Sequence, residues 1–238
     1  FSWPILSPLY FPSVINQLLQ NPENLKLGGE RRRISIFFSD IENFTSISEP
    51  LQPEQLTDLL NKYLSELSEI ILKNGGTIDK YEGDAIIAFW NAPLDTENHE
   101  RKAIETAIEC QKRLKELNSE FVKIAGRPLA TRIGINTGDA VVGNMGSSKR
   151  FDYTAFGDSV NLASRLEGLN KDFGTYILCT KETALYAKQQ GSSLKFRKIA
   201  YAKVLGKDKA VPVYSPTTKE DFEKQKEQIM IFEKGLKL

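Results

Sequence analysis

Two aspartates stand at the ends of apolar runs and are the residues of this sequence best placed to do chemistry. Asp40 follows the run 34–39, and Asp84 lies between the runs 77–81 and 85–90. A carboxylate at a strand end is held stiffly and stays partly exposed, and two converging carboxylates would bind hard divalent cations. Such a metal pair suits phosphoryl or nucleotidyl chemistry. For either aspartate alone, capping of a turn is the alternative interpretation.

A third block, at residues 150–167, favours the metal-binding interpretation. Together with the two aspartate segments it resembles the class III nucleotidyl cyclases, the family of adenylate and guanylate cyclases. The three blocks occur in that family's order and at about its spacings, so the resemblance covers residues 30 to 216. The matching pieces are Phe38 to Ile41, Phe44 and Thr45, Lys80 to Asp84, Tyr153 and Thr154, Gly157 and Asp158, and Val160 to Arg165.

The resemblance implies an enzyme that joins the ribose 3′-hydroxyl of a nucleoside triphosphate to its own α-phosphate and expels pyrophosphate. It also implies that Asp40 and Asp84 bridge two metal ions and that the backbone carbonyl of Ile41 completes one coordination shell. Magnesium or manganese suits these oxygen ligands, whereas zinc would favour nitrogen or sulfur donors. We therefore expect two Mg²⁺ or Mn²⁺ ions per site, one activating the hydroxyl and the other neutralising phosphate charge.

Lys80 and Thr154 match the two positions that read the base in this family. Lysine accompanies adenine there, because an ammonium only donates hydrogen bonds and adenine offers ring-nitrogen acceptors. Threonine occurs in a bacterial and soluble-type subgroup of adenylate cyclases, and its hydroxyl tolerates the adenine amino group because it can both accept and donate. The pair predicts ATP as the substrate. That subgroup includes bicarbonate-stimulated members, so bicarbonate activation is a further hypothesis.

Asn161 and Arg165 lie four residues apart and therefore on one face of a predicted helix. By resemblance, Asn161 orients the ribose, and Arg165 stabilises the charge that builds on the α-phosphate. A planar guanidinium suits that task because its donors match phosphate oxygens.

Contacts with the rest of the triphosphate are expected from basic residues outside these motifs. Lys207 fits the family's late phosphate-binding lysine, with Lys209 as a neighbouring alternative. Lys149 or Arg150 fits the basic residue that approaches the phosphates from the metal-binding side. Either could instead be a solvated charge in a hairpin.

The resemblance also implies a head-to-tail homodimer. In the family, the metal ligands and the base-reading residues of one site come from different protomers, and this chain carries both sets. Two equivalent sites would then form across the dimer interface. Rotation of one protomer against the other would change activity without altering any ligand, which would let an upstream sensor or membrane module control the enzyme.

The bulk composition is that of an ordinary globular chain. With 238 residues, 40% hydrophobic and 26% charged, it suits one domain with short appendages. The net charge of +1 gives no reason to expect nucleic acid as a partner. Cys110 and Cys179 have no partner spacing and predict a reducing compartment without a structural metal site. We expect His99 on the surface at a helix start, and residues 31–33 as a solvated lead-in to the first strand rather than an anion-binding patch.

The sequence also suggests how the domain is anchored. The chain begins at Phe1 without an initiator methionine, so we expect residues 1–30 to be a connector from a larger protein. No apolar run reaches the length of a membrane span. We expect a cytoplasmic location, with tethering to the inner face of the membrane through missing N-terminal segments left open.

Hydrophobic periodicity predicts an α+β class with a mixed, mostly antiparallel sheet flanked by helices. The cyclase resemblance implies a fold derived from the ferredoxin-like arrangement. We expect the catalytic domain at residues 31–216 and a C-terminal helical tail at 217–238. The expected strands are 34–39, 77–81, 85–90, 130–136, 140–143, 176–179, 194–203 and 212–214, and the expected helices are 54–73, 97–125, one starting near 158, 181–189 and 219–234.

Two alternatives remain open at this stage. One is a guanylate or dual-specificity cyclase, which Lys80 argues against. The other is a catalytically weak cyclase homology domain that acts as a dimerisation or regulatory module, and the presence of the catalytic residues argues against it. Glu82 departs from the family pattern by adding a carboxylate beside Asp84, where it could disturb metal affinity.

Overall fold

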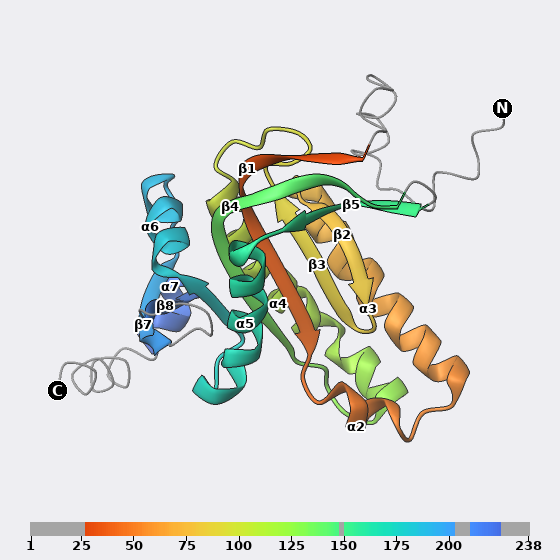
Figure 1. Cartoon of the computed structure of the whole chain (residues 1–238). Helices are drawn as coiled ribbons and strands as arrows, with labels where there is room; N and C mark the ends of the chain where they lie inside the picture. Colours follow the sequence, from red (N-terminus) through yellow and green to blue (C-terminus); the bar gives the residue numbers. More distant parts are fainter. Residues whose placement is uncertain (1–26, 148–149, 203–209, 225–238) are drawn as a thin grey trace.

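The computed structural model describes residues 27–147, 150–202 and 210–224 (Figure 1). Its strands form one sheet in the order β2-β3-β1-β4-β6-β8-β7, and β5 pairs with β4 outside this path. The β4–β6 pairing is parallel and the others are antiparallel. The strands are β1 (Gly28–Ile41), β2 (Thr77–Glu82), β3 (Ala85–Trp90), β4 (Thr131–Ser147), β5 (Arg150–Phe156), β6 (Ile177–Thr180), β7 (Lys195–Ala202) and β8 (Val211–Thr217).

Helices cover both faces of this sheet, as Figure 1 shows for α5 on one side and α3 and α4 on the other. This arrangement confirms the predicted α+β class with a mixed, mostly antiparallel sheet. The helices are α2 (Phe44–Ser48), α3 (Pro53–Lys73), α4 (His99–Ala125), α5 (Asp158–Phe173), α6 (Lys181–Gln189) and α7 (Lys219–Lys224).

The central strand β1 is apolar on both faces because both faces are covered. Successive side chains alternate across a strand. Ile34 and Ile36 pack on the side of α5, while Phe37 and Ile41 pack in the larger core formed with α3 and α4. Asp40 has the same parity as Ile34 and Ile36, so the alternation directs its carboxylate to the α5 face.

The helix α3 is fixed at both ends by local signals. Gln52 and Gln55 form a reciprocal capping box, and Pro53 occupies the first turn, where its missing N–H costs no hydrogen bond. The helix ends at Asn74, and Gly75 follows with φ of 78°. Its apolar face buries Leu59, Tyr63, Leu67, Ile70 and Ile71 against the sheet.

Two glycines set the position of α5. A Cβ atom on Gly134 of β4 would lie 2.2 Å from the carbonyl oxygen of Ala163 and 2.2 Å from the amide nitrogen of Glu167. Only glycine therefore lets the backbone of α5 approach β4 this closely. Gly157, directly before α5, has φ of 140°, a conformation that other residues rarely adopt.

Three of the predicted strands are different in the structure. The predicted hairpin at 130–136 and 140–143 is wrong, because residues 131–147 form the single strand β4, whose hairpin partner is the unpredicted β5. The strand predicted at 34–39 begins earlier, since Gly28 to Arg33 pair with Asn144 to Asp139. The Thr137-Gly138-Asp139 segment has turn-like residues, but its backbone pairs with Ile34 and its neighbours along β1.

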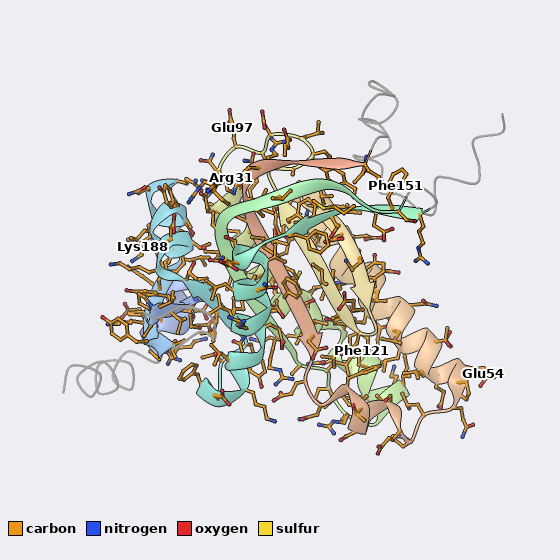
Figure 2. All side chains as sticks on the ribbon, in the orientation of Figure 1. Arg31, Glu54, Glu97, Phe121, Phe151 and Lys188 are labelled. Atoms are coloured by element: carbon orange, nitrogen blue, oxygen red, sulfur yellow. The ribbon has the colours of Figure 1, made fainter. Side chains whose placement is uncertain are left out.

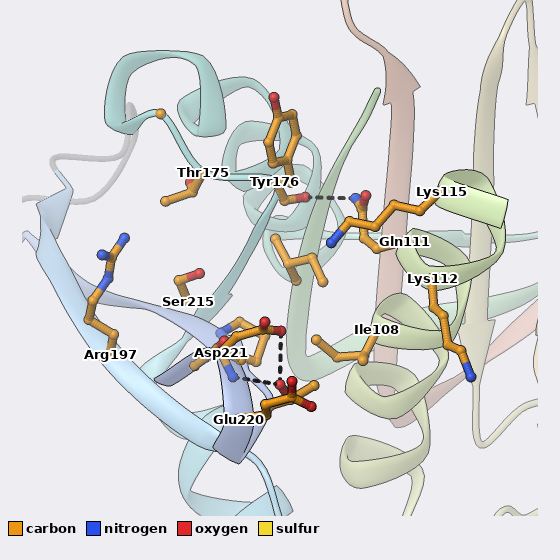
Figure 3. A pocket seen from close by; sticks show the side chains of 15 residues that line it. Ile108, Gln111, Lys112, Lys115, Thr175, Tyr176, Arg197, Ser215, Glu220 and Asp221 are labelled. Atoms are coloured by element: carbon orange, nitrogen blue, oxygen red, sulfur yellow. Dashed lines mark hydrogen bonds between the residues drawn. The ribbon is translucent and has the colours of Figure 1, made fainter. Parts of the chain in front are cut away.

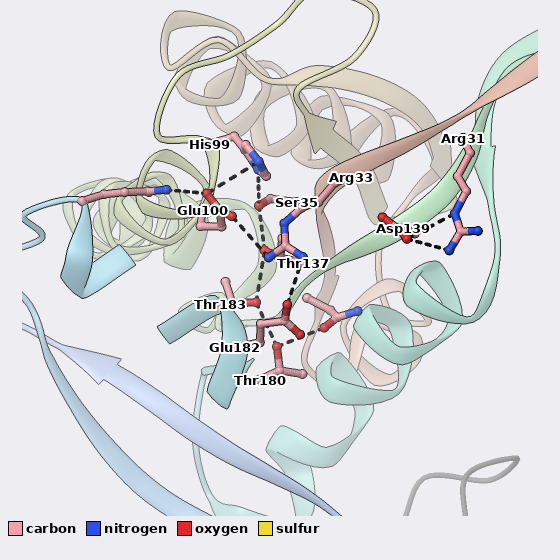
Figure 4. A network of polar contacts seen from close by, with 12 residues as sticks. Arg31, Arg33, Ser35, His99, Glu100, Thr137, Asp139, Thr180, Glu182 and Thr183 are labelled. Atoms are coloured by element: carbon pink, nitrogen blue, oxygen red, sulfur yellow. Dashed lines mark hydrogen bonds and ion pairs between the residues drawn. The ribbon is translucent and has the colours of Figure 1, made fainter. Parts of the chain in front are cut away.

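His99 lies at a helix start, as predicted, but the prediction that it lies on the surface is wrong. His99 begins α4 but is only 9% exposed, and its Nδ1 lies 2.8 Å from Oγ of Ser35 (Figure 4). Ser35 also lies 2.8 Å from the hydroxyl of Thr137, so β1, β4 and α4 meet in one polar network. Cys110 and Cys179 are both buried and free.

The basic segment before the first predicted strand lies within β1 and is paired with acidic side chains. Arg31 bonds Asp139 at 2.7 Å, and Arg32 bonds the carboxylate of Asp95. Arg33 bonds Glu182 at 2.9 Å and lies 3.5 Å from buried Glu100 (Figure 4). Arg32 and Arg33 thereby hold a loop and the first turns of α4 and α6 to β1, whereas Arg31 is exposed, as expected of a solvated segment. The segment forms part of β1 rather than a lead-in to it.

The predicted appendages lie largely outside the described residues. The connector at 1–30 is described only from residue 27, and the tail helix at 219–234 only over α7, which ends at Lys224. Strand β8 ends at Thr217, next to the predicted end of the catalytic domain. Within the described ranges, no helix combines the length and apolar character needed to cross a membrane.

Candidate active site

The two aspartates predicted to hold metal converge in the structure. Asp40 is near the end of β1, and Asp84 lies in the turn between β2 and β3. Because β3 pairs with β1, this turn lies beside the end of β1. The amide N–H of Ile41 donates to Oδ2 of Asp84 at 2.9 Å. The Asp84 carboxylate lies near enough to Asp40 to raise the pKa of that residue. The prediction that strand ends bring these carboxylates together is confirmed.

The carboxylates create an unfavourable cluster of negative charge in the metal-free chain. Burial raises the pKa of Asp40 to about 7, and the hydrogen bond and charge of Asp84 and the charge of Glu167 add to this effect. Arg132 opposes it, with Nη2 lying 3.9 Å from Oδ2 of Asp40 and Nε 3.4 Å from Oε1 of Glu167. Burial also raises the pKa of Glu167.

This donor set fits a hard divalent cation. Asp40 and Asp84 contribute carboxylate oxygens, and Ile41 adds a backbone carbonyl beside them. A cation would relieve the repulsion that raises the pKa of Asp40. Sequence analysis missed Arg132, although strand register could have revealed it, because Arg132 sits directly opposite Asp40 in the β1–β4 pairing.

The predicted base-reading residues line a separate cavity of about 270 Å³. Lys80 comes from β2, Thr154 from β5 and Asn161 from the first turns of α5, three elements brought together around the sheet. Glu82, which was expected beside the metal ligand Asp84, lines this cavity together with Lys80. The described lining is Phe38, Asp79, Lys80, Glu82, Ile87, Thr154, Ala155, Phe156, Gly157, Val160, Asn161 and Ser164.

A buried carboxylate at this cavity was not predicted. The side chain of Asp79 is 3% exposed, and its Oδ2 accepts a hydrogen bond from Oγ1 of Thr154 at 2.7 Å. Its Oδ1 lies 3.8 Å from Nζ of Lys80. Burial raises the pKa of Asp79, while the Thr154 hydrogen bond and the Lys80 charge lower it.

Arg165 and Arg150 are not among the described residues that line this cavity. Arg165 is exposed on α5, one helical turn after Asn161. Arg150 begins β5 next to Phe151, at the far end of the arm formed by β4 and β5 (Figure 2). Lys149 and Lys207 lie outside the described residues.

A further cavity, of about 450 Å³, lies on the α4 side of the sheet (Figure 3). It is bordered by Lys112 and Lys115 of α4, Arg197 of β7, and Glu220 and Asp221 of α7. Within the part of the chain that the structure describes, no residue predicted for nucleotide or metal binding borders it. The chemistry suggested by the sequence therefore lies on the α5 side.

Comparison with known proteins identifies the family. Residues 29–215 match the domain described as the adenylate and guanylate cyclase catalytic domain. The chain belongs to this family. It is 40% identical over 185 residues to adenylate cyclase 1 of Rhizobium meliloti, covering 77% of this chain and 27% of that protein. It is 38% identical over 213 residues to an adenylate cyclase of Anabaena cylindrica, covering 87% of this chain and 41% of that protein.

Solved cyclase structures share this fold. The crystal structure of the adenylyl cyclase CyaB from P. aeruginosa is similar with a TM-score of 0.74 and 38% identity, covering 81% of this chain and 97% of that chain. The guanylyl cyclase Cya2 is similar with a TM-score of 0.73 and 34% identity, covering 81% and 95%. The chain spans 27% and 41% of the length of the two adenylate cyclases above. The similar structures include an adenylyl and a guanylyl cyclase.

Proposed function

We propose that this chain is the catalytic domain of an adenylate cyclase, which converts ATP to 3′,5′-cyclic AMP and pyrophosphate. The observation that carries the proposal is the cavity in which Lys80, Thr154 and Asn161 meet. Lys80 offers donors to adenine ring nitrogens, and Thr154 offers an oxygen to the adenine amino group. The adenylate cyclase names of the bacterial relatives support the same substrate.

In the proposed reaction, the 3′-oxygen of the ribose attacks the α-phosphorus while the bond from that phosphorus to the β-phosphate bridging oxygen breaks. The hydroxyl loses its proton, and pyrophosphate leaves with the bonding electron pair. Asn161, at the start of α5, would bind and orient the ribose. Arg165, one turn later, would stabilise the added negative charge on the α-phosphate oxygens.

Asp40, Asp84 and the carbonyl of Ile41 would hold two Mg²⁺ or Mn²⁺ ions. When bound, such ions make the ribose hydroxyl more acidic and neutralise charge on the phosphates. Arg132 would keep Asp40 in place by balancing part of the negative charge at this edge of the sheet. Arg150, Lys149 and Lys207 remain the proposed contacts with the phosphates.

A head-to-tail homodimer fits the separation of these two groups. Asp40 and Asp84 do not border the cavity that Lys80, Thr154 and Asn161 line in the same chain. We propose that the carboxylates of one protomer face the cavity of its partner, which yields two equivalent sites. The longer relatives suggest that further modules, such as a sensor or membrane segment, regulate this dimer in a full-length cytoplasmic enzyme.

The test is a cyclisation assay with purified protein, Mn²⁺ and either ATP or GTP. We expect cyclic AMP and pyrophosphate in equal amounts, with ATP strongly preferred. Asp40→Asn removes a charged ligand, so we expect turnover to fall by about a hundredfold or more. Asp58→Asn, an exposed change on α3, serves as the control and should leave the rate unchanged.

Two results would contradict the proposal. Cyclic GMP as the main product would assign the chain to the guanylate cyclases. Absence of any cyclic nucleotide from folded, dimeric protein would favour a regulatory homology domain.

A further inference from the structure

Asp79 lies directly behind the two residues proposed to read the base. Its carboxylate is almost completely buried, with Oδ2 bonded to the Thr154 hydroxyl at 2.7 Å and Oδ1 lying 3.8 Å from the Lys80 ammonium. Among the described residues, Oδ1 has no hydrogen-bond partner. A buried carboxylate with an unsatisfied oxygen costs folding free energy, so its presence at this position suggests a role other than stability.

An irregularity in β2 turns Asp79 into the cavity. The β2–β3 register pairs Ile78 with Ala88 and Lys80 with Ile87, which leaves Asp79 as an extra residue between them. In a regular strand, Asp79 and Lys80 would point to opposite faces. Both border the cavity instead, as expected where a bulge redirects a side chain.

The hydrogen bond between Asp79 and Thr154 has a defined donor and acceptor. An ionised carboxylate only accepts hydrogen bonds, so the Thr154 hydroxyl must donate its single proton to Oδ2. The remaining lone pairs of Thr154 are then available to a ligand, and the hydroxyl can act there only as an acceptor. Burial raises the pKa of Asp79, and the Thr154 hydrogen bond and the Lys80 charge oppose this effect by stabilising the ionised form. In that form Oδ2 accepts the Thr154 proton over the observed 2.7 Å.

We propose that Asp79 is a positioning residue that sets the purine preference of the site by fixing Thr154 as a hydrogen-bond acceptor. This inference rests on the proposed function, because it assumes that the base occupies this cavity. Adenine carries an amino group at position 6, which donates to an acceptor. Guanine carries a carbonyl oxygen there, which would face the lone pairs of Thr154 and be repelled.

The proposal explains how a threonine can discriminate between purines. A free hydroxyl rotates and serves either base, because it donates as readily as it accepts. With its proton held by Asp79, the same hydroxyl favours adenine. The specificity would then belong to the Asp79–Thr154 pair together with Lys80, and no single one of these residues would suffice.

The test measures the affinities of the full chain for non-cyclisable analogues of ATP and GTP, by calorimetry in the presence of Mg²⁺. Asp79→Asn keeps the shape of the side chain, but its amide can either accept from or donate to Thr154, so the hydroxyl is no longer fixed. We expect the ratio of ATP-analogue to GTP-analogue affinity to fall about tenfold, the worth of one hydrogen bond. Asp172→Asn, an exposed change near the end of α5, is the control for loss of one carboxylate and should keep the wild-type ratio.

A double-mutant cycle separates this role from a structural one. Thr154→Val removes the hydroxyl, so in that background Asp79→Asn should leave the ratio unchanged. The inference is overturned if Asp79→Asn weakens both analogues equally, if its effect on the ratio persists with Thr154→Val, or if the unmodified chain shows no preference. Selective binding of the ATP analogue without cyclic AMP formation would refute the proposed function while the inference stands.

Discussion

Asp40 and Asp84 oppose folding in the metal-free chain, because two partly buried carboxylates repel one another. The pKa of Asp40, about 7, records burial together with that repulsion. Arg132 compensates from the paired strand at a distance of 3.9 Å. Under the proposed function, bound divalent cations would offset this repulsion.

The base-reading role of Lys80 and Thr154 predicts a change of specificity. Lys80→Glu replaces the donor to the adenine ring nitrogens by an acceptor for guanine N1 and N2, and Thr154→Cys removes the hydroxyl that accepts from the adenine amino group. With both changes, GTP should become the better substrate. The measurement is kcat/KM for both nucleotides, with Lys80→Ala as the comparison that removes the donor without adding an acceptor. An unchanged preference for ATP after the double change would remove these residues from the base site.

At this scale the sequence predicted some of the residues that meet but not how they are held. The family resemblance grouped Lys80, Thr154 and Asn161, which line one cavity, although Arg165 from the same group does not line it. Asp79 was missed because a regular strand directs it away from Lys80, and only the bulge in the β2–β3 register reverses that. His99 was misplaced because its burial depends on Ser35, a partner 64 positions away.

At the scale of elements, the position of α5 decides whether Asn161 and Arg165 can reach a nucleotide. The helix rests on β4 through the bare backbone of Gly134, with Ala163 and Glu167 directly above it. A shift of α5 would move the ribose-binding and phosphate-binding side chains together.

Gly134→Ala should therefore lower both stability and activity. Its new Cβ would overlap backbone atoms of α5 that lie 2.2 Å away, and such overpacking typically costs about 1–3 kcal/mol. Gly168→Ala is the matched control, since no atom lies within 4 Å of its Cβ and alanine favours a helix. Thermal unfolding checks both. Equal stability of Gly134→Ala and the unmodified chain would refute the close approach of α5 to β4.

The polar junction of β1, β4 and α4 predicts a pH dependence of stability. Burial lowers the pKa of His99, and Arg33 adds to this effect against the charge of Glu100. The unfolded histidine titrates near about 6.5, so below that pH the unfolded chain binds more protons and the free energy of unfolding falls. Denaturant titrations from about pH 7.5 to about pH 5 cover both sides of that pKa. Over this range, the free energy of unfolding should fall less for His99→Asn than for the unmodified chain. Parallel curves would contradict a buried neutral His99.

Element boundaries were predictable where the signals are local. The helix α3 has its capping residues, proline and terminal glycine in sequence, and the prediction for it was correct to within one residue at the start. β4 was not predictable in the same way, because Thr137 to Asp139 have turn-like composition. Their strand conformation comes from pairing with β1, about a hundred residues earlier in the chain.

At the scale of the whole molecule, the chain carries two groups of functional residues in different places. The carboxylate pair lies at the ends of β1 and of the β2–β3 hairpin, and the nucleotide cavity lies between β2, β5 and α5. A second copy placed head to tail would bring each group opposite its complement. Such an arrangement makes activity depend on how two protomers are oriented, which suits control by additional modules of a longer protein.

Mixing two inactive variants tests this arrangement most directly. Asp40→Ala removes a metal ligand, and Asn161→Ala removes the ribose contact from the other group. If each site combines the two groups from different protomers, half of the dimers in an equal mixture are mixed, and each has one intact site. We predict that the two inactive proteins, once mixed, regain about one quarter of the unmodified activity. A mixture that stays as inactive as its components would contradict a shared site.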